Sequence, residues 1–144
     1  MKIILAVDDS NDSEAAIGAL SKLRPEENEI RVVHVLQPVA VSAPPQMAAG
    51  YAPELAGQAP EAERLVSGYA NKLRSSGFRV ETSVIEGDVR ESIVDAAKDW
   101  PADLIVMGSK GHSAISQLLL GSAAESVVRH ATCSVLIARG SKAR

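Results

Sequence analysis

The stretch "IVMGSKGHSAISQLLLGSAAESVV", from Ile105 to Val128, decides the fold. An apolar run of strand length leads into Gly108 and Gly111, and after Gly121 apolar residues recur at helical spacing. A strand that turns through glycine into a helix is the repeating unit of a parallel α/β sheet. Because glycine weakens the interior of helices and strands, glycines at both ends of the segment require a reason. Either they permit close packing or they let the backbone approach a phosphate.

The composition indicates one domain. The 144 residues, of which 46% are hydrophobic and 23% charged, suffice for one sizeable core and are too few for two ordinary domains. We therefore expect a single domain over residues 1–144. The formal net charge is −3 and the only basic block is 142–144, so no general affinity for nucleic acid is expected. An aromatic content of 3% agrees, because single-strand binders need aromatic stacking platforms.

The same totals bear on location and on thiol chemistry. The longest apolar runs have the length of strands, so no membrane span is expected. The opening "MKIILAVDDS" has acidic residues directly after its apolar run and no small-residue cleavage site, which predicts a first strand and a cytoplasmic protein. The single cysteine, Cys133, excludes an intramolecular disulfide framework and is expected to be a buried, inert thiol.

Strand-like runs alternate with helical patterns along the chain. The runs fall at Lys2–Val7, Glu29–Leu36, Phe78–Glu86, Asp103–Gly108 and Ser134–Arg139. Helices are expected after a cap at Asn11 as far as Pro25, from near Pro60 to Gly77, from the capping pair Asp88 and Glu91 to Trp100, and from a cap at Ser122. The alternation predicts an α/β fold with a single, doubly wound parallel sheet of five strands and helices on both faces.

Residues 37–60 interrupt this pattern. Five of the seven prolines fall here, Glu54 is the only charged residue, and alanines fill much of the remainder. The composition predicts a Pro/Ala-rich loop insertion or a lid. Tyr51 and Met47 either cover a nucleotide or are exposed residues of that loop, and exposure is favoured.

The glycine segment has the parts of a phosphate site. Gly108 ends the strand 103–108, and in an open parallel sheet ligands bind beyond the carboxyl ends of the strands. Gly108 and Gly111 lack a Cβ, so their N–H groups can approach an oxyanion closely. A helix that begins at Ser122 presents unpaired N–H groups and the positive end of its dipole. The Ser109 and Ser122 hydroxyls can add donors.

Two better-known phosphate motifs are absent. In "GSKGHS" the lysine precedes the second glycine, so the segment is not a Walker A loop. The first strand runs into "AVDDS", which lacks the glycines of the dinucleotide motif G-x-G-x-x-G.

These residues resemble the universal stress protein family. "GSKG" at 108–111 and "GS" at 121–122 match the nucleotide signature G-x2-G-x9-G-[ST] of that family. Asp8 at the end of the first strand, "VVHV" in the second, "GD" at 87–88 and the final "SVLIA" fall in the same order. The resemblance therefore covers essentially the whole chain.

The resemblance implies an adenine-nucleotide-binding stress-response domain with strand order 3-2-1-4-5. It also implies a homodimer through the last strand, 134–139. Members that bind ATP keep this glycine pattern, so ATP is the implied ligand, with Mg²⁺ held through its phosphates and Asp8 as one further contact to the metal. By position, adenosine would lie against Ala6, Val7, Asp8 and Val35. Ribose and phosphates would lie against Met107, Gly108, Lys110, Gly111, Gly121, Ser122 and Ala123.

Several residues keep two readings. Asp8 and Asp9 form either a metal-binding acidic pair at the strand end or a solvated turn that opens the first helix. Ligand contact is favoured for Asp8, and the turn is favoured for Asp9. Lys110 is a counter-charge for phosphate or a surface lysine, and His112 lies near a γ-phosphate or simply in the loop. His34 lies inside a buried strand and is expected to be a core histidine with a backbone partner.

No catalytic constellation is legible in the sequence. Beyond Asp8 no carboxylate stands near the glycine segment, and no Ser/His/Asp or Cys/His arrangement is apparent. We therefore expect a nucleotide-dependent sensor or regulator with at most slow ATP hydrolysis.

Two other classes of protein remain open. A phosphoacceptor receiver domain also has acidic residues after its first strand and a late lysine, which "VDDS" and Lys110 imitate. A receiver needs an aspartate at the end of strand three, however, and Asp88 is better explained as a helix cap. In a nucleotide-free dimerisation module, the glycines would serve only the packing of helix against strand.

Overall fold

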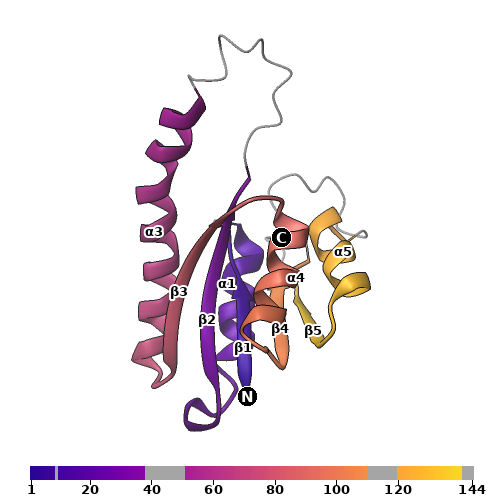
Figure 1. The fold of residues 1–144 in the computed structure, drawn as a ribbon. Coiled ribbons are helices and arrows are strands. Elements are labelled where there is room, and N and C mark those ends of the chain that lie inside the picture. Colours follow the sequence, from indigo (N-terminus) through magenta and orange to yellow (C-terminus); the bar gives the residue numbers. More distant parts are fainter. Residues whose placement is uncertain (9, 38–50, 110–119, 141–144) are drawn as a thin grey trace.

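The computed structural model describes residues 1–8, 10–37, 51–109 and 120–140 (Figure 1). Within this part of the chain five strands form one sheet in the order β3-β2-β1-β4-β5, and every neighbouring pair is parallel. The strands are β1 (Lys2–Ala6), β2 (Glu29–Leu36), β3 (Arg79–Glu86), β4 (Leu104–Gly108) and β5 (Ser134–Ala138). The predicted α/β class, the five-stranded parallel sheet and the order 3-2-1-4-5 are confirmed.

Helices cover both faces of the sheet, as predicted (Figure 1). The helices are α1 (Asn11–Leu20), α3 (Tyr51–Ser75), α4 (Val89–Asp99) and α5 (Ser122–His130), with a short 3-10 turn, η1 (Pro25–Glu27). Of the helices in the described ranges, none combines the length and apolarity needed to cross a membrane.

The two faces follow from the alternation of side chains along each strand. Ile3 and Leu5 of β1 are fully buried on the face that α1 and α3 cover. Ile4, between them, is fully buried on the opposite face, which α4 and α5 cover. Each such side chain contributes on the order of 1.5–3 kcal/mol through burial, and the near-continuous apolar runs of the sequence reflect burial on both faces.

Helix α3 corrects the prediction for residues 37–60. It begins at Tyr51 and contains Pro60 in its interior, whereas the sequence was interpreted as loop up to Pro60. Pro53 lies in the first turn, where its missing N–H has no helical partner to lose, and Ala, Leu, Glu and Gln nearby favour helix. Pro60 costs one interior hydrogen bond, which a helix of 25 residues tolerates. Met47 lies outside the described residues.

The helix ends differ from prediction by small shifts. Helix α1 ends at Leu20, and Pro25 opens η1 instead of terminating α1. The cap of α1 is Ser10 and the cap of α5 is Gly121, each one residue before the predicted capping side chain. Asp88 is confirmed as the cap of α4, since its carboxylate accepts hydrogen bonds from the N–H groups of Arg90 and Glu91.

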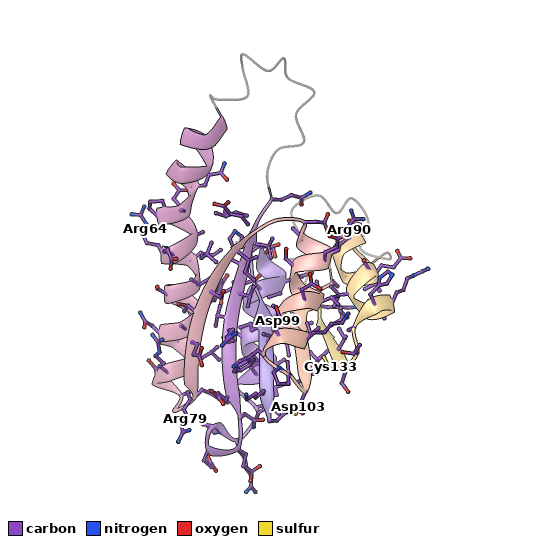
Figure 2. All side chains as sticks on the ribbon, viewed as in Figure 1. Arg64, Arg79, Arg90, Asp99, Asp103 and Cys133 are labelled. Atoms are coloured by element: carbon purple, nitrogen blue, oxygen red, sulfur yellow. The ribbon has the colours of Figure 1, made fainter. Side chains whose placement is uncertain are left out.

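The edge of the sheet at the amino ends of the strands is held by charged side chains around Trp100. The Lys2 Nζ lies 5.2 Å and the Arg31 Cζ 4.6 Å from the centroid of this ring, which is 8% exposed. Figure 2 shows Arg79 and Asp103 at this edge and Arg90 at the opposite one. The Lys2 N–H donates to Asp103 Oδ2 at 2.8 Å. These contacts close the core at the edge where the strands begin.

Cys133 is less buried than predicted, because it precedes the edge strand β5 and is only half-buried. Its partial burial still raises the pKa of the thiol above the ordinary value of 9.0. The thiolate is thereby disfavoured, and the inertness of the thiol stays a prediction.

Candidate functional site

A cavity of about 440 Å³ opens at the carboxyl ends of β1, β2 and β4. Ligand sites in proteins commonly occupy roughly 300–1,000 Å³. Loops and helix starts meet at this edge because every strand of a parallel sheet ends there. The cavity lies at β1, which has β2 on one side and β4 on the other, so the strand order changes direction there. The lining residues come from these strand ends and from the first turns of α1, α4 and α5.

One wall of the cavity is apolar. Val35 and Met107, which are 9% and 6% exposed, line it from β2 and β4, and Ile93 lines it from α4. These side chains belong to the hydrophobic cluster that α4 and α5 form with the sheet. The wall suits a flat, apolar group such as a nucleobase.

The carboxylate of Asp8 is held in one orientation. Its Oδ1 accepts hydrogen bonds from the Ser10 N–H at 2.8 Å and from the Ser13 hydroxyl at 3.0 Å. The Ser13 Oγ in turn accepts from the Asp8 N–H at 2.9 Å, and Ser13 is only 2% exposed. Both hydrogen bonds that the carboxylate accepts go to Oδ1, so Oδ2 remains for a donor in the cavity.

The end of β1 is fixed by two further side chains. His34 Nδ1 lies 2.7 Å from the Val7 carbonyl oxygen, and because that oxygen only accepts, Nδ1 carries the proton in this bond. The Tyr69 hydroxyl donates to the Asp8 carbonyl at 3.3 Å. The backbone partner predicted for His34 is confirmed, and His34 also lines the cavity.

At the end of β4, Gly108 is required by packing. A Cβ placed on Gly108 would lie 2.4 Å from the Cβ of Asp12 on α1, closer than real atoms approach. Ser109 is 3% exposed, and its hydroxyl donates to Asp12 Oδ2 at 2.8 Å. The hydroxyl predicted as a phosphate donor is therefore already engaged, and Ser109 lies behind the cavity wall.

The start of α5 supplies donors to the cavity. Gly121 caps the helix, and its carbonyl accepts from the Glu125 N–H at 2.9 Å. The first N–H groups of a helix have no partner within it, and here they belong to Ser122, Ala123 and Ala124, which line the cavity. Together with the helix dipole they favour an anion.

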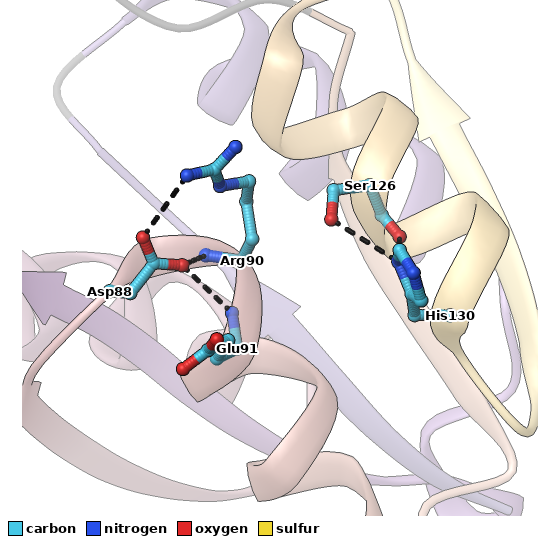
Figure 3. A network of polar contacts seen from close by, with 5 residues as sticks. All are labelled: Asp88, Arg90, Glu91, Ser126 and His130. Atoms are coloured by element: carbon cyan, nitrogen blue, oxygen red, sulfur yellow. Dashed lines mark hydrogen bonds and ion pairs between the residues drawn. The ribbon is translucent and has the colours of Figure 1, made fainter.

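Near the mouth of the cavity, Arg90 forms an ion pair with the capping carboxylate (Figure 3). Its Nη2 lies 3.3 Å from Asp88 Oδ2. The Glu91 N–H and the Arg90 side chain hold the pKa of Asp88 below its ordinary value of 3.8. On the neighbouring α5, His130 Nδ1 lies 2.8 Å from the Ser126 carbonyl (Figure 3). Asp88 thus serves as a helix cap, which counts against a phosphoacceptor role.

The predicted site residues fall into three groups. Those that line the cavity are Ala6, Val7, Asp8, Val35, Met107, Gly108, Ser122 and Ala123. Gly121 and Ser109 lie directly behind this lining and support it. Asp9, Lys110, Gly111 and His112 lie outside the described residues.

The sequence did not indicate every lining residue. Ser13, Ile93 and Arg90 also line the cavity, and His34 had been read only as a core residue. Arg90 follows the cap of α4 by two positions, so the one available signal was that this helix begins at the carboxyl edge. No cluster of three His, Cys, Asp or Glu side chains in the described ranges is arranged to hold a metal ion.

Comparison with known proteins gives a consistent result. The model of the universal stress protein family matches residues 1–139. The universal stress protein YxiE of Bacillus subtilis is 29% identical over 145 residues, which cover 96% of this chain and 98% of that protein.

Solved structures agree in fold. The universal stress protein UspA from Lactobacillus plantarum is 25% identical with a TM-score of 0.86, over 96% of this chain and 97% of that one. A universal stress protein family protein from Arabidopsis thaliana, with AMP bound, is 22% identical with a TM-score of 0.73, over 98% and 92% of the chains. A universal stress protein in complex with cAMP has a TM-score of 0.70 at 22% identity, over 98% of each chain. The chain therefore belongs to the universal stress protein family.

Proposed function

We propose that this chain binds adenine nucleotides, ATP among them, in the cavity at the carboxyl edge of the sheet. The observation that carries the proposal is the meeting of an apolar wall, an oriented carboxylate and a free helix N-terminus around one cavity. A nucleotide presents a base, a ribose and phosphates in that order. Family members with AMP and cAMP bound support the choice of adenine nucleotides.

Each part of the ligand has a matching part of the site. The base lies against Val35 and Met107, beside Ala6 and Val7. The free oxygen of Asp8 accepts a ribose hydroxyl. The phosphates meet the N–H groups of Ser122 and Ala123, with Gly108, Lys110, Gly111 and Gly121 completing the glycine signature at 108–122.

The residues present fit a metal that arrives with the nucleotide. Asp8 is the one carboxylate among the described lining residues, and its Oδ1 is already occupied by Ser10 and Ser13. Mg²⁺ would therefore be held through the phosphates, with Asp8 as at most one contact. Bound there, the ion would neutralise phosphate charge.

We assign to the protein the role of a nucleotide-dependent sensor or regulator in a stress response, in the cytoplasm. The described lining residues show no Ser/His/Asp or Cys/His arrangement, because Ser13 serves to orient Asp8 and His34 bonds to the Val7 carbonyl. Hydrolysis of ATP is accordingly slow. Single-turnover measurements with labelled ATP test this point, and rapid turnover by the isolated protein would exclude the sensor role.

We further propose a homodimer through the edge strand β5. Leu136 of β5 is 38% exposed and Val128 of the adjacent α5 is 48% exposed. Among the described residues, β5 pairs with a strand on one side alone, and apolar edge strands need a partner or a cover.

Calorimetric titration with ATP, ADP, AMP and cAMP tests the nucleotide proposal, together with mass analysis of small molecules released from the denatured protein. Saturable binding of at least one of them supports it. No heat with any nucleotide, and no nucleotide in the released fraction, would leave the dimerisation module as the better reading. Labelling of Asp88 by acetyl phosphate would instead favour the receiver domain.

Replacement of Gly121 by valine tests the phosphate half of the site. The φ of Gly121 is −63°, so valine adopts this backbone without strain and adds a side chain where we propose that the phosphates approach. We expect a loss of ATP affinity of roughly tenfold or more, which is about 1.4 kcal/mol, with the fold retained. Gly68→Val is the matched control, because a Cβ at Gly68 meets no atom within 4 Å. Equal affinity in both variants would mean that the segment is structural.

A further inference from the structure

One carboxylate of helix α1 bonds to the residues that follow β4 and β5. Asp12 Oδ2 accepts from the Ser109 hydroxyl at 2.8 Å, and Asp12 Oδ1 accepts from the Gly140 N–H at 2.7 Å. The partners follow Asp12 by 97 and 128 residues in the chain. Asp12 therefore joins the residues just beyond β4 and β5 to the first turn of α1.

The contact with Ser109 extends to the start of α5. The Ser109 N–H donates to the Ala138 carbonyl at 2.9 Å, and the Ser109 carbonyl accepts from the Gly121 N–H at 2.6 Å. Ser109 is thus held by its side chain, its N–H and its carbonyl at once. Because Gly121 caps α5, this hydrogen bond ties Ser109 to the start of the helix whose first N–H groups face the cavity.

The neighbouring residue of α1 serves the other half of the cavity. Ser13 orients the Asp8 carboxylate, as described above, while Asp12 anchors Ser109. Gly108 makes the second contact possible, since any Cβ there would collide with Asp12. Two consecutive residues of α1 thus contact different parts of the site, Ser13 the Asp8 carboxylate and Asp12 the Ser109 hydroxyl.

We propose that Asp12 is a positioning residue for the phosphate half of the nucleotide site. It acts through Ser109 and Gly121 on the N-terminus of α5 and does not itself line the cavity. The inference rests on the proposed function and adds the residue that sets the donor geometry.

The test compares ATP with adenosine as titrants for the full chain. In Asp12→Ala we expect ATP affinity to fall about tenfold while adenosine affinity changes less than about twofold, because only the phosphates meet α5. Asp12→Asn should restore most of the loss. Its Oδ1 can accept from Gly140, and its amide can donate to a Ser109 hydroxyl that now accepts. Ser109→Ala should lower ATP affinity by a smaller factor.

Amide hydrogen exchange gives a readout without ligand. The Gly121 N–H should exchange faster in Asp12→Ala than in the wild type, with Asp12→Asn close to the wild type. If Asp12→Ala leaves the ratio of ATP affinity to adenosine affinity unchanged, whether both affinities fall equally or neither falls, the proposed role of Asp12 is overturned. A wild-type protein that binds neither compound overturns the proposed function itself.

Discussion

At the scale of single residues, Gly108 of the nucleotide motif has a role in packing as well as the ligand contact predicted for it. The sequence suggested close approach of its backbone to a phosphate, whereas the structure shows the close approach of Asp12. The two roles are compatible, because the packing that requires glycine also brings Asp12 to Ser109.

Gly108→Ala should therefore destabilise the fold. The added carbon would meet the Asp12 Cβ at 2.4 Å, and such overpacking typically costs about 1–3 kcal/mol. Urea denaturation followed by the fluorescence of Trp100, the single tryptophan, measures the effect. Gly68→Ala should do the opposite and stabilise by about 0.5–1 kcal/mol, because its site in α3 is open. Equal midpoints for the two variants would contradict the packing argument.

Asp88 gives a prediction in pH. The pKa of its carboxyl is lower in the folded protein than its ordinary value of 3.8, because the charged form accepts the Glu91 N–H and pairs with Arg90. The unfolded chain thus binds the proton more readily, and the stabilisation is present above 3.8 and lost as the pH falls through the folded pKa. Asp88→Ala should melt a few degrees lower than the wild type at neutral pH. In increasingly acidic buffers the two melting temperatures should converge, and a gap that persists would exclude the cap as its source.

At the scale of elements, the sequence predicted what local chemistry determines. The apolar runs predicted the strands, and the capping side chain of Asp88 predicted the start of α4. The first part of α3 was missed because the prolines of this segment were taken to indicate a loop. Pro53, however, lies in the first turn of the helix, where proline is tolerated. Ser13, His34 and Arg90 were not assigned to the site, because strand order alone does not tell which side chains of the strand ends and first helical turns face the cavity.

Pro60→Ala tests the continuity of α3. Alanine would restore the N–H that an interior proline lacks and remove the clash with the preceding turn, a local gain of up to about 3 kcal/mol. We expect slower amide exchange over residues 51–59 and little change in the global unfolding midpoint, since residues 58–60 contribute little to the core. Unchanged exchange there would indicate that Pro60 does not limit this part of the helix.

At the scale of the whole molecule, the sheet has two edges of different character. Strand β3 ends one side with Arg79, Glu81 and Thr82 exposed, whereas β5 ends the other with the exposed Leu136. The proposed dimer uses the apolar edge.

Leu136→Lys should dissociate that dimer, because a lysine on an apolar edge strand opposes pairing. Sedimentation at micromolar concentration should show a dimer for the wild type and a monomer for the variant. Thr82→Lys on β3 is the control and should remain dimeric. A monomeric wild type, or a variant that stays dimeric, would rule out β5 as the interface.

The link between Asp12 and Gly140 also has a consequence for the order in which the protein matures. A ribosome delivers residues from the amino end, and β1, β2 and β3 can pair before β4 and β5 have emerged. The groups around the cavity come from both the earliest and the latest segments of the chain. A nascent chain can therefore form the β1–β3 part of the sheet before it can bind a ligand.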